Sequence, residues 1–463
     1  MSGFESLMWE LERDPQLSSA FANLTLFDRP PDRVVFRTRM EHATRAVPRL
    51  RQRVVSARAP WDHPEWVEDL DFDLDHHLRW VDLGGDADDR ALYDVAATLM
   101  RQPFDRERPL WEFVTIEGLR GGRAAMLQRL HHTITDGEGG IRLSVQFLDF
   151  EREPGPTDTT APVRREPRGD GAAPPPAQPD EVDAVGFWGR SAAALGGAAS
   201  RVTGSAAALP RKGGELTAVA RSTFRQVTVG SHRSPLWSER SLQRWLGTAV
   251  LSLEDVRSAA HHLGGSVNDL FITGAASAAG RVHAAAGMPV EELRVSMPIS
   301  TRHDRSVGGN AFSPTQTLVP TGEMTSTERF ARIHEILTAV KTERVIDSLE
   351  GAANAAAMLP SAALVRSGQH LAGSVDFVCS NVRAAPFDLF IAGGFMEANY
   401  PLGPLAGTAF NLTTMSYRGW LFLGLVTDPA AVDDPDELLG ELERAYRELL
   451  RAGGVRRPRR PPV

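Results

Sequence analysis

The 463-residue chain has a single cysteine, Cys379, and no long apolar run. One cysteine excludes an intramolecular disulfide framework and fits a reducing compartment. No uninterrupted apolar stretch reaches the roughly 18 residues that span a bilayer, and the start, MSGFESLMWELERD, lacks the basic and then apolar order of a signal peptide. We therefore expect a cytoplasmic protein whose membrane contact is at most peripheral, on the inner face of the plasma membrane or on lipid inclusions.

The chain also lacks a basic excess and internal repeats. Its 51 Lys and Arg residues against 59 Asp and Glu residues give a formal net charge of -8, which argues against a nucleic-acid partner. No period of about 20 to 50 residues recurs, so a solenoid is excluded. Hydrophobic residues at 42% and charged residues at 24% are ordinary for a folded protein, and the length favours two or more packed units.

Composition divides the chain into five segments. In the first, residues 1–150, strand-like runs alternate with helical stretches, among them RVVFRTRM, EFVTIEGL and AAMLQRL, which predicts an α/β domain. Residues 151–181 crowd proline, glycine and charge together, and we expect an exposed, disordered linker. Residues 182–230 are rich in alanine and predict a connecting helical segment, which either packs between domains or lies on a membrane surface.

The fourth segment, residues 231–452, predicts a second α/β domain. Ser252 is a candidate N-cap for LEDVRSAAHH, and SVNDLFITGAASAAGR opens another helix. Arg418 and Gly419 form a two-residue turn between two strands, and Asp434 with Pro435 starts the last helix. The fifth segment, residues 453–463, is a basic tail that is either solvated and disordered or in contact with anionic lipid.

Three His-His pairs provide an internal comparison. His76 and His77 are expected at the edge of a strand, and His261 and His262 fall late in a predicted helix, where a structural role is sufficient. The pair His131 and His132 instead follows the buried strand AAMLQRL and precedes a glycine-rich bend, TDGEGG. Successive strand residues point to opposite faces, so only one of these two histidines can face a given cleft.

The residues around this third pair leave two interpretations open. Adjacent histidines diverge and no cysteine or third histidine stands at a ligand spacing, so no metal site is expected. No G-x-S-x-G elbow marks a serine hydrolase. A catalytic histidine and a polar turn with a satisfied buried histidine both remain compatible with the sequence.

The segment HHTITDG, from His131 to Gly137, matches the HHxxxDG pattern of the CoA-dependent acyltransferase superfamily. With its context, QPFDRERPLWEFVTIEGL upstream and SVNDLFITGAASAAGR and VSMPISTR downstream, the chain resembles bacterial wax ester synthase/diacylglycerol acyltransferases. The resemblance extends from about residue 48 to residue 450, interrupted by the linker. It implies two chloramphenicol-acetyltransferase-like α/β sandwich domains with the active site in a tunnel between them.

The resemblance also implies site residues. His132 would be the general base, since a histidine titrates near neutrality. His131, Asp136 and Gly137 would support the motif, with Arg302 as a candidate ionic partner of Asp136. Asn268 is a candidate polar group near the oxyanion or the loop.

The expected substrates follow from the same resemblance. Acyl-CoA would be a co-substrate, no cofactor would be permanently bound, and a lipid alcohol would accept the acyl group directly, giving triacylglycerol or wax ester. The first 30 residues and the segment SNVRAAP depart from the family pattern. These departures affect the expected acceptor alcohol more than the expected type of reaction. The alternatives are an acyltransferase for a secondary-metabolite alcohol and a catalytically silent lipid-binding protein.

Overall fold

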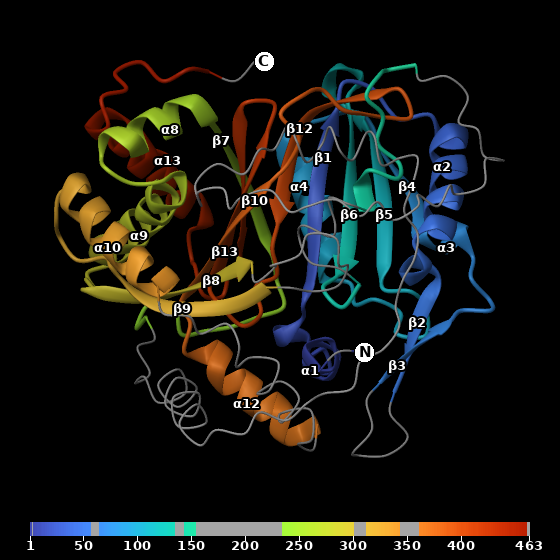
Figure 1. Ribbon diagram of the computed structural model, residues 1–463, viewed down its shortest axis with the longest axis horizontal. Coiled ribbons are helices and arrows are strands. Elements are labelled where there is room, and N and C mark those ends of the chain that lie inside the picture. Colours follow the sequence, from blue (N-terminus) through green and yellow to red (C-terminus); the bar gives the residue numbers. More distant parts are fainter. Residues whose placement is uncertain are drawn as a thin grey trace, which may run out of the picture.

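The computed structural model shows two sheets standing side by side, with helices packed around them (Figure 1). It describes residues 1, 3–56, 64–134, 143–153, 234–300, 312–342 and 361–460. The predicted linker from residue 154 onward and the predicted connecting segment, residues 182–230, lie outside the described residues.

The first sheet has the strand order β11-β12-β1-β6-β5-β4. Only β4 and β5 pair in parallel, and the other neighbours are antiparallel. The strands are β1 (Ala20–Phe27), β4 (Leu78–Ala87), β5 (Trp111–Leu119), β6 (Ala124–His131), β11 (Phe390–Ile391) and β12 (Gly394–Leu402). A separate two-stranded sheet pairs β2 (Gln52–Val55) with β3 (Glu65–Glu68).

The second sheet has the order β7-β14-β13-β10-β8-β9. Its parallel pairs are β10 with β13 and β10 with β8. The strands are β7 (Trp245–Ser252), β8 (Glu292–Ser300), β9 (Phe312–Pro320), β10 (Phe377–Arg383), β13 (Phe410–Tyr417) and β14 (Trp420–Thr427).

The helices cover opposite flanks of the molecule. On the first-sheet side lie α2 (Arg33–Ala46) and α3 (Leu74–His77), and on the second-sheet side lie α8 (Leu253–His262), α9 (Val267–Ala285), α10 (Ser326–Thr342) and α13 (Pro435–Ala452) (Figure 1). The other helices are α1 (Gly3–Leu11), which contacts α12 (Ser361–Gly373), and α4 (Asp89–Arg101). Short 3₁₀ turns occupy Pro15–Leu17, Pro48–Arg51 and Arg120–Gly122.

Local sequence signals explain several of these elements. RVVFRTRM begins α2, where the Asp32 carboxylate accepts from the backbone N–H groups of Val34 and Val35. The predicted two-residue turn is confirmed, because Tyr417 pairs with Trp420 and both intervening residues have positive φ. The predicted starts of α8 at Ser252 and of α13 at Asp434 and Pro435 are confirmed as well.

The two sheets do not follow the two halves of the sequence. β12 comes from the C-terminal half, yet it pairs with β1 along six residues, from Ala22 with Leu402 to Phe27 with Met396. The predicted division into residues 1–150 and 231–452 therefore requires one addition: Phe390–Leu402 belongs to the first sheet. This exchange has no local sequence signal, because pairing between β1 and β12 depends only on tertiary contact.

Side chains also join the halves across α4 and β7. The Arg90 guanidinium donates to the carbonyl of Leu246 at 3.0 Å, and the hydroxyls of Tyr93 and Thr248 lie 2.8 Å apart. The apolar core around the first sheet also contains Leu246 and Phe422 from the second. The interface between the halves is thus part of the folded core.

The described part of the C-terminal tail lies against α8. The backbone N–H of Arg459 donates to Asp255 at 2.7 Å, and its guanidinium donates to Glu254. The side chains of Arg459 and Glu254 are both exposed, so their ion pair adds little stability.

Candidate active site

The His-His pair lies where β6 leaves the first sheet. All eight residues of β6 are buried, as the apolar run predicts. Arg129 within it is neutralised by Glu112 at 2.6 Å. His131 ends the strand opposite Ala20 of β1, and its backbone N–H donates to the carbonyl of Leu110 at 3.0 Å.

The His131 ring has hydrogen bonds at both nitrogens and is 1% exposed. The backbone N–H of Thr133 donates to Nδ1 at 3.2 Å, and the Thr133 hydroxyl lies 2.7 Å from the same atom. Because Nδ1 accepts, the proton is on Nε2, which donates to the Glu12 carboxylate at 2.9 Å. His131 is therefore held as one tautomer with no ring nitrogen facing a substrate.

Glu12 follows α1 directly and meets three donors. Besides His131, the Ser18 hydroxyl donates to Oε1 at 2.7 Å and the Ser19 backbone N–H donates to Oε2 at 2.8 Å. Burial by itself would raise the pKa of the Glu12 carboxyl, but these hydrogen bonds outweigh it and the pKa lies below its usual value. The carboxylate is thus ionised and fixed.

His132 has different surroundings from His131, as strand alternation predicts. Its backbone N–H donates to the carbonyl of Ser19 at 3.2 Å, and its ring packs on Phe21 with 4.5 Å between the ring centroids. The side chain is only half-buried. Of the two histidines, His132 is the one whose side chain is partly exposed.

Of the other predicted site residues, the structure describes only Asn268, and it shows no hydrogen bond from Asn268 to the histidine pair. Asp136 and Gly137 follow the described turn and, like Arg302, lie outside the described residues. Asn268 lies in the first turn of α9, and no hydrogen bond among the described residues joins it to His131 or His132. Its neighbour Asp269 completes the capping box with Ser266 and contacts His334 at 2.9 Å.

The two other His-His pairs have structural positions. His77 ends α3, immediately before β4, and its ring stacks on Trp111 with 4.4 Å between centroids. His261 and His262 end α8, as predicted, and both are exposed. Cys379 is buried in β10, and burial raises the pKa of its thiol.

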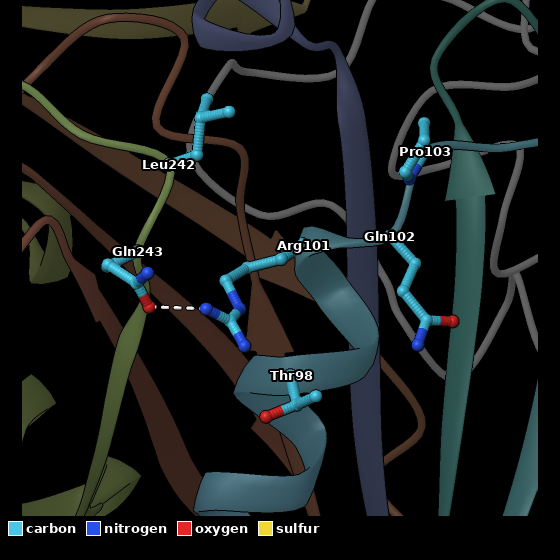
Figure 2. A pocket seen from close by; sticks show the side chains of 6 residues that line it. All are labelled: Thr98, Arg101, Gln102, Pro103, Leu242 and Gln243. Atoms are coloured by element: carbon cyan, nitrogen blue, oxygen red, sulfur yellow. Dashed lines mark hydrogen bonds between the residues drawn. The ribbon is translucent and has the colours of Figure 1, made fainter.

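An open pocket of about 350 Å³ lies on the seam between the halves (Figure 2). Its lining comes from the end of α4 and from the segment before β7, namely Thr98, Arg101, Gln102, Pro103, Leu242 and Gln243. Arg101 donates across the seam to the Gln243 side chain (Figure 2). The carbonyl of Gln102 accepts from Arg129, which ties the rim to β6 two residues before His131.

Two further properties of the described residues bear on the site. Nowhere in the described ranges do three or more histidine, cysteine or acidic side chains gather as a metal site would require. Among the helices in those ranges, none combines the length and apolarity needed to cross a bilayer.

Glu12, Phe21 and Thr133 are site residues that the sequence did not predict. Thr133 lies within the motif, at an x position where many residues fit the pattern. Glu12 is 119 residues from His131, and no spacing rule connects the two. Only the pairing of β1 with β6 brings the segment before β1 to the end of β6.

Solved structures share this arrangement of two sheets. The wax ester synthase/diacylglycerol acyltransferase from Marinobacter aquaeolei superposes with a TM-score of 0.63 at 20% identity, covering 97% of this chain and 98% of that one. The starter condensation domain of rhizomide synthetase, solved as a variant with C8-CoA, gives a TM-score of 0.59 at 15% identity, covering 98% and 94%. The fold is that of the two-domain, chloramphenicol-acetyltransferase-like acyltransferases.

Sequence comparison narrows this class. Residues 1–271 match the model of the wax ester synthase/diacylglycerol acyltransferase catalytic domain, and residues 308–450 match the WS/DGAT C-terminal domain. Two Mycobacterium tuberculosis proteins, each named a putative diacylglycerol O-acyltransferase, are 33% and 26% identical to this chain. The first alignment covers 99% of this chain and 93% of the relative, and the second covers 90% and 82%. The chain belongs to the wax ester synthase/diacylglycerol acyltransferase family and is an acyltransferase of that type.

Proposed function

We propose that this enzyme transfers an acyl group from acyl-CoA to the hydroxyl of a lipid alcohol, with His132 as the general base. The observation that carries the assignment is the difference between the two rings. The side chain of His131 is 1% exposed, whereas that of His132, at the end of β6 beside Phe21, is only half-buried.

The chemistry requires a single group that can both take up and return a proton. A ring nitrogen of His132 accepts the proton of the alcohol as the alcohol oxygen attacks the thioester carbonyl carbon. The tetrahedral intermediate then collapses, the C–S bond breaks, and the same nitrogen returns the proton to the CoA sulfur. An ester and free CoA result, with no acyl-enzyme. In this proposal Asp136 and Gly137 shape the loop after His132, Arg302 pairs with Asp136, and Asn268 is a candidate oxyanion or loop group.

Family membership supports a lipid acceptor, either diacylglycerol or a long-chain alcohol. The test incubates the full chain with radiolabelled acyl-CoA, each acceptor and lipid vesicles, and separates the products. Ester from either acceptor supports the proposal. Ester formed only with a secondary-metabolite alcohol would replace the acceptor class, and bound lipid without ester on any acceptor would indicate a silent lipid-binding protein.

The variant His132→Ala tests the base. Turnover should fall by at least about 100-fold, the lower end of what general base catalysis contributes, with an unchanged circular dichroism spectrum. The matched control is His262→Ala, which removes an exposed histidine at the end of α8 and should keep wild-type turnover. Wild-type turnover by His132→Ala would reject the assignment.

A further inference from the structure

We infer that Glu12 is a positioning residue for this reaction, which holds His131 and thereby the turn that carries His132. The inference rests on the proposed role of His132 and goes beyond it, because it assigns a task to a side chain outside the HHxxxDG segment. Glu12 itself meets no reacting atom in this scheme.

The Glu12 carboxylate is connected to both histidines. Its Oε2 accepts from the Nε2–H of His131 at 2.9 Å and from the backbone N–H of Ser19 at 2.8 Å. The carbonyl of Ser19 in turn accepts from the backbone N–H of His132 at 3.2 Å. One carboxylate therefore fixes the ring of the first histidine and, through Ser19, the backbone of the second.

The contact with Glu12 also sets the geometry of the turn. A proton on Nε2 of His131 leaves Nδ1 as an acceptor, and Nδ1 receives the backbone N–H of Thr133. If Nδ1 carried the proton instead, this bond in the first turn after β6 would be lost. The Nε2–H tautomer of His131 therefore keeps the hydrogen bond that fixes Thr133, the residue after His132.

The cost of placing Glu12 here indicates that its position matters. Its side chain is only 15% exposed, and hydrogen bonds from Ser18, Ser19 and His131 offset the loss of hydration of the buried carboxylate. A carboxylate surrounded by aimed donors on its own segment and on β6 is a rigid link between those two parts of the chain. The neighbouring Glu10 is buried to a similar degree, but among the described residues its carboxylate pairs with Arg13 at 2.7 Å and makes no hydrogen bond to either histidine.

Two substitutions separate geometry from charge. Glu12→Gln keeps the length of the side chain, and its amide oxygen can replace Oε2 while its NH₂ group donates to the Ser18 hydroxyl. Glu12→Asp keeps the charge but withdraws the carboxylate by one methylene. A positioning role predicts that Glu12→Gln keeps kcat within about 3-fold, whereas Glu12→Asp lowers kcat by about 10- to 100-fold with the KM for acyl-CoA within about 2-fold.

The matched control is Glu10→Ala, which should keep wild-type kinetics. A role through charge alone would reverse the order of the two Glu12 variants, and wild-type kinetics for Glu12→Asp would show that the link is dispensable; either result overturns the inference. If Glu12→Asp does not fold, the decision rests on Glu12→Gln, whose loss of turnover in a folded state would also contradict the positioning role.

A second readout does not need activity. Histidine-selective ¹⁵N NMR, with the His131 signals identified by their loss in His131→Gln, should show the Nε2–H tautomer of His131 in the wild type and in Glu12→Gln. An Nδ1–H tautomer in the wild type would overturn the inference even if the enzyme is active. Conversely, a wild-type chain that makes no ester on any acceptor fails the proposed function, while the NMR result still reports on the contact between Glu12 and His131.

Discussion

Two buried histidines of this protein are stabilised in different ways. His131 has an ionised carboxylate as its partner, whereas the hydrogen bond of His77 within the described ranges goes to the carbonyl of Trp111, to which its Nδ1–H donates at 2.7 Å. His77 also lies between aromatic rings, with 4.4 Å to Trp111 and 5.2 Å to Phe72 between centroids. Burial lowers the pKa of His77 to about 4, although the bond to the Trp111 carbonyl opposes the shift.

This shift predicts a dependence of stability on pH. The folded state protonates His77 only near pH 4, while an unfolded histidine protonates near 6.5, so between these values the unfolded state binds more protons. His77 should therefore contribute a loss of about 2 kcal/mol in the free energy of unfolding as the pH falls from 7 to 5. The variant His77→Phe keeps a stacked ring that does not titrate. Between pH 7 and 5 its free energy of unfolding, measured by urea denaturation, should fall by about 2 kcal/mol less than that of the wild type. Equal losses in both proteins would contradict the pKa.

At the scale of elements, local signals were the most informative. The start of α13 at Asp434 and Pro435 and the turn at Arg418 and Gly419 depend on residues within one turn of the chain. For the same reason RVVFRTRM forms a helix, because the Asp32 cap and the buried positions Phe36 and Met40 agree with a helical period. His76 and His77 were expected at the edge of a strand, and they close the four-residue α3 immediately before β4.

Two glycine substitutions test these elements in opposite directions. Gly419 has φ +81° in the β13–β14 turn, so Gly419→Ala should lower the free energy of unfolding by about 1–2 kcal/mol. Gly440 lies exposed within α13, and an added Cβ there meets no atom within 4 Å. Gly440→Ala should raise the free energy of unfolding by about 0.5–1 kcal/mol. Chemical denaturation measures both, and a stabilising Gly419→Ala would contradict the turn geometry.

At the scale of the whole molecule, β12 connects the two sheets. It pairs with β1 in the first sheet, and at Pro401 its backbone approaches β14 of the second so closely that only glycine fits opposite. A Cβ on Gly424 would lie 2.0 Å from the Pro401 carbonyl oxygen and 2.9 Å from the Leu402 side chain. The close approach of the sheets therefore depends on the absence of one methyl group.

Gly424→Ala should force β12 and β14 apart and lower the free energy of unfolding by about 1–3 kcal/mol, the usual cost of overpacking. Thermal and urea denaturation measure this loss. Because the pairing of β12 with β1 also orders the strand beside β6, turnover should fall together with stability. An unchanged free energy of unfolding would mean that the two strands lie farther apart than the contact at Pro401 requires.

From residue patterns alone we could predict the family, the α/β class, the position of the His-His pair at the end of a buried strand, and the start of several helices. These features follow from residue type, spacing and neighbours within a few positions. Two features became evident only in the folded chain: Phe390–Leu402 completes the first sheet, and Glu12 holds His131. The physical reason is the same in both cases: hydrogen bonds between segments far apart in the chain leave no periodic or local trace, because their geometry exists only after the sheets have formed.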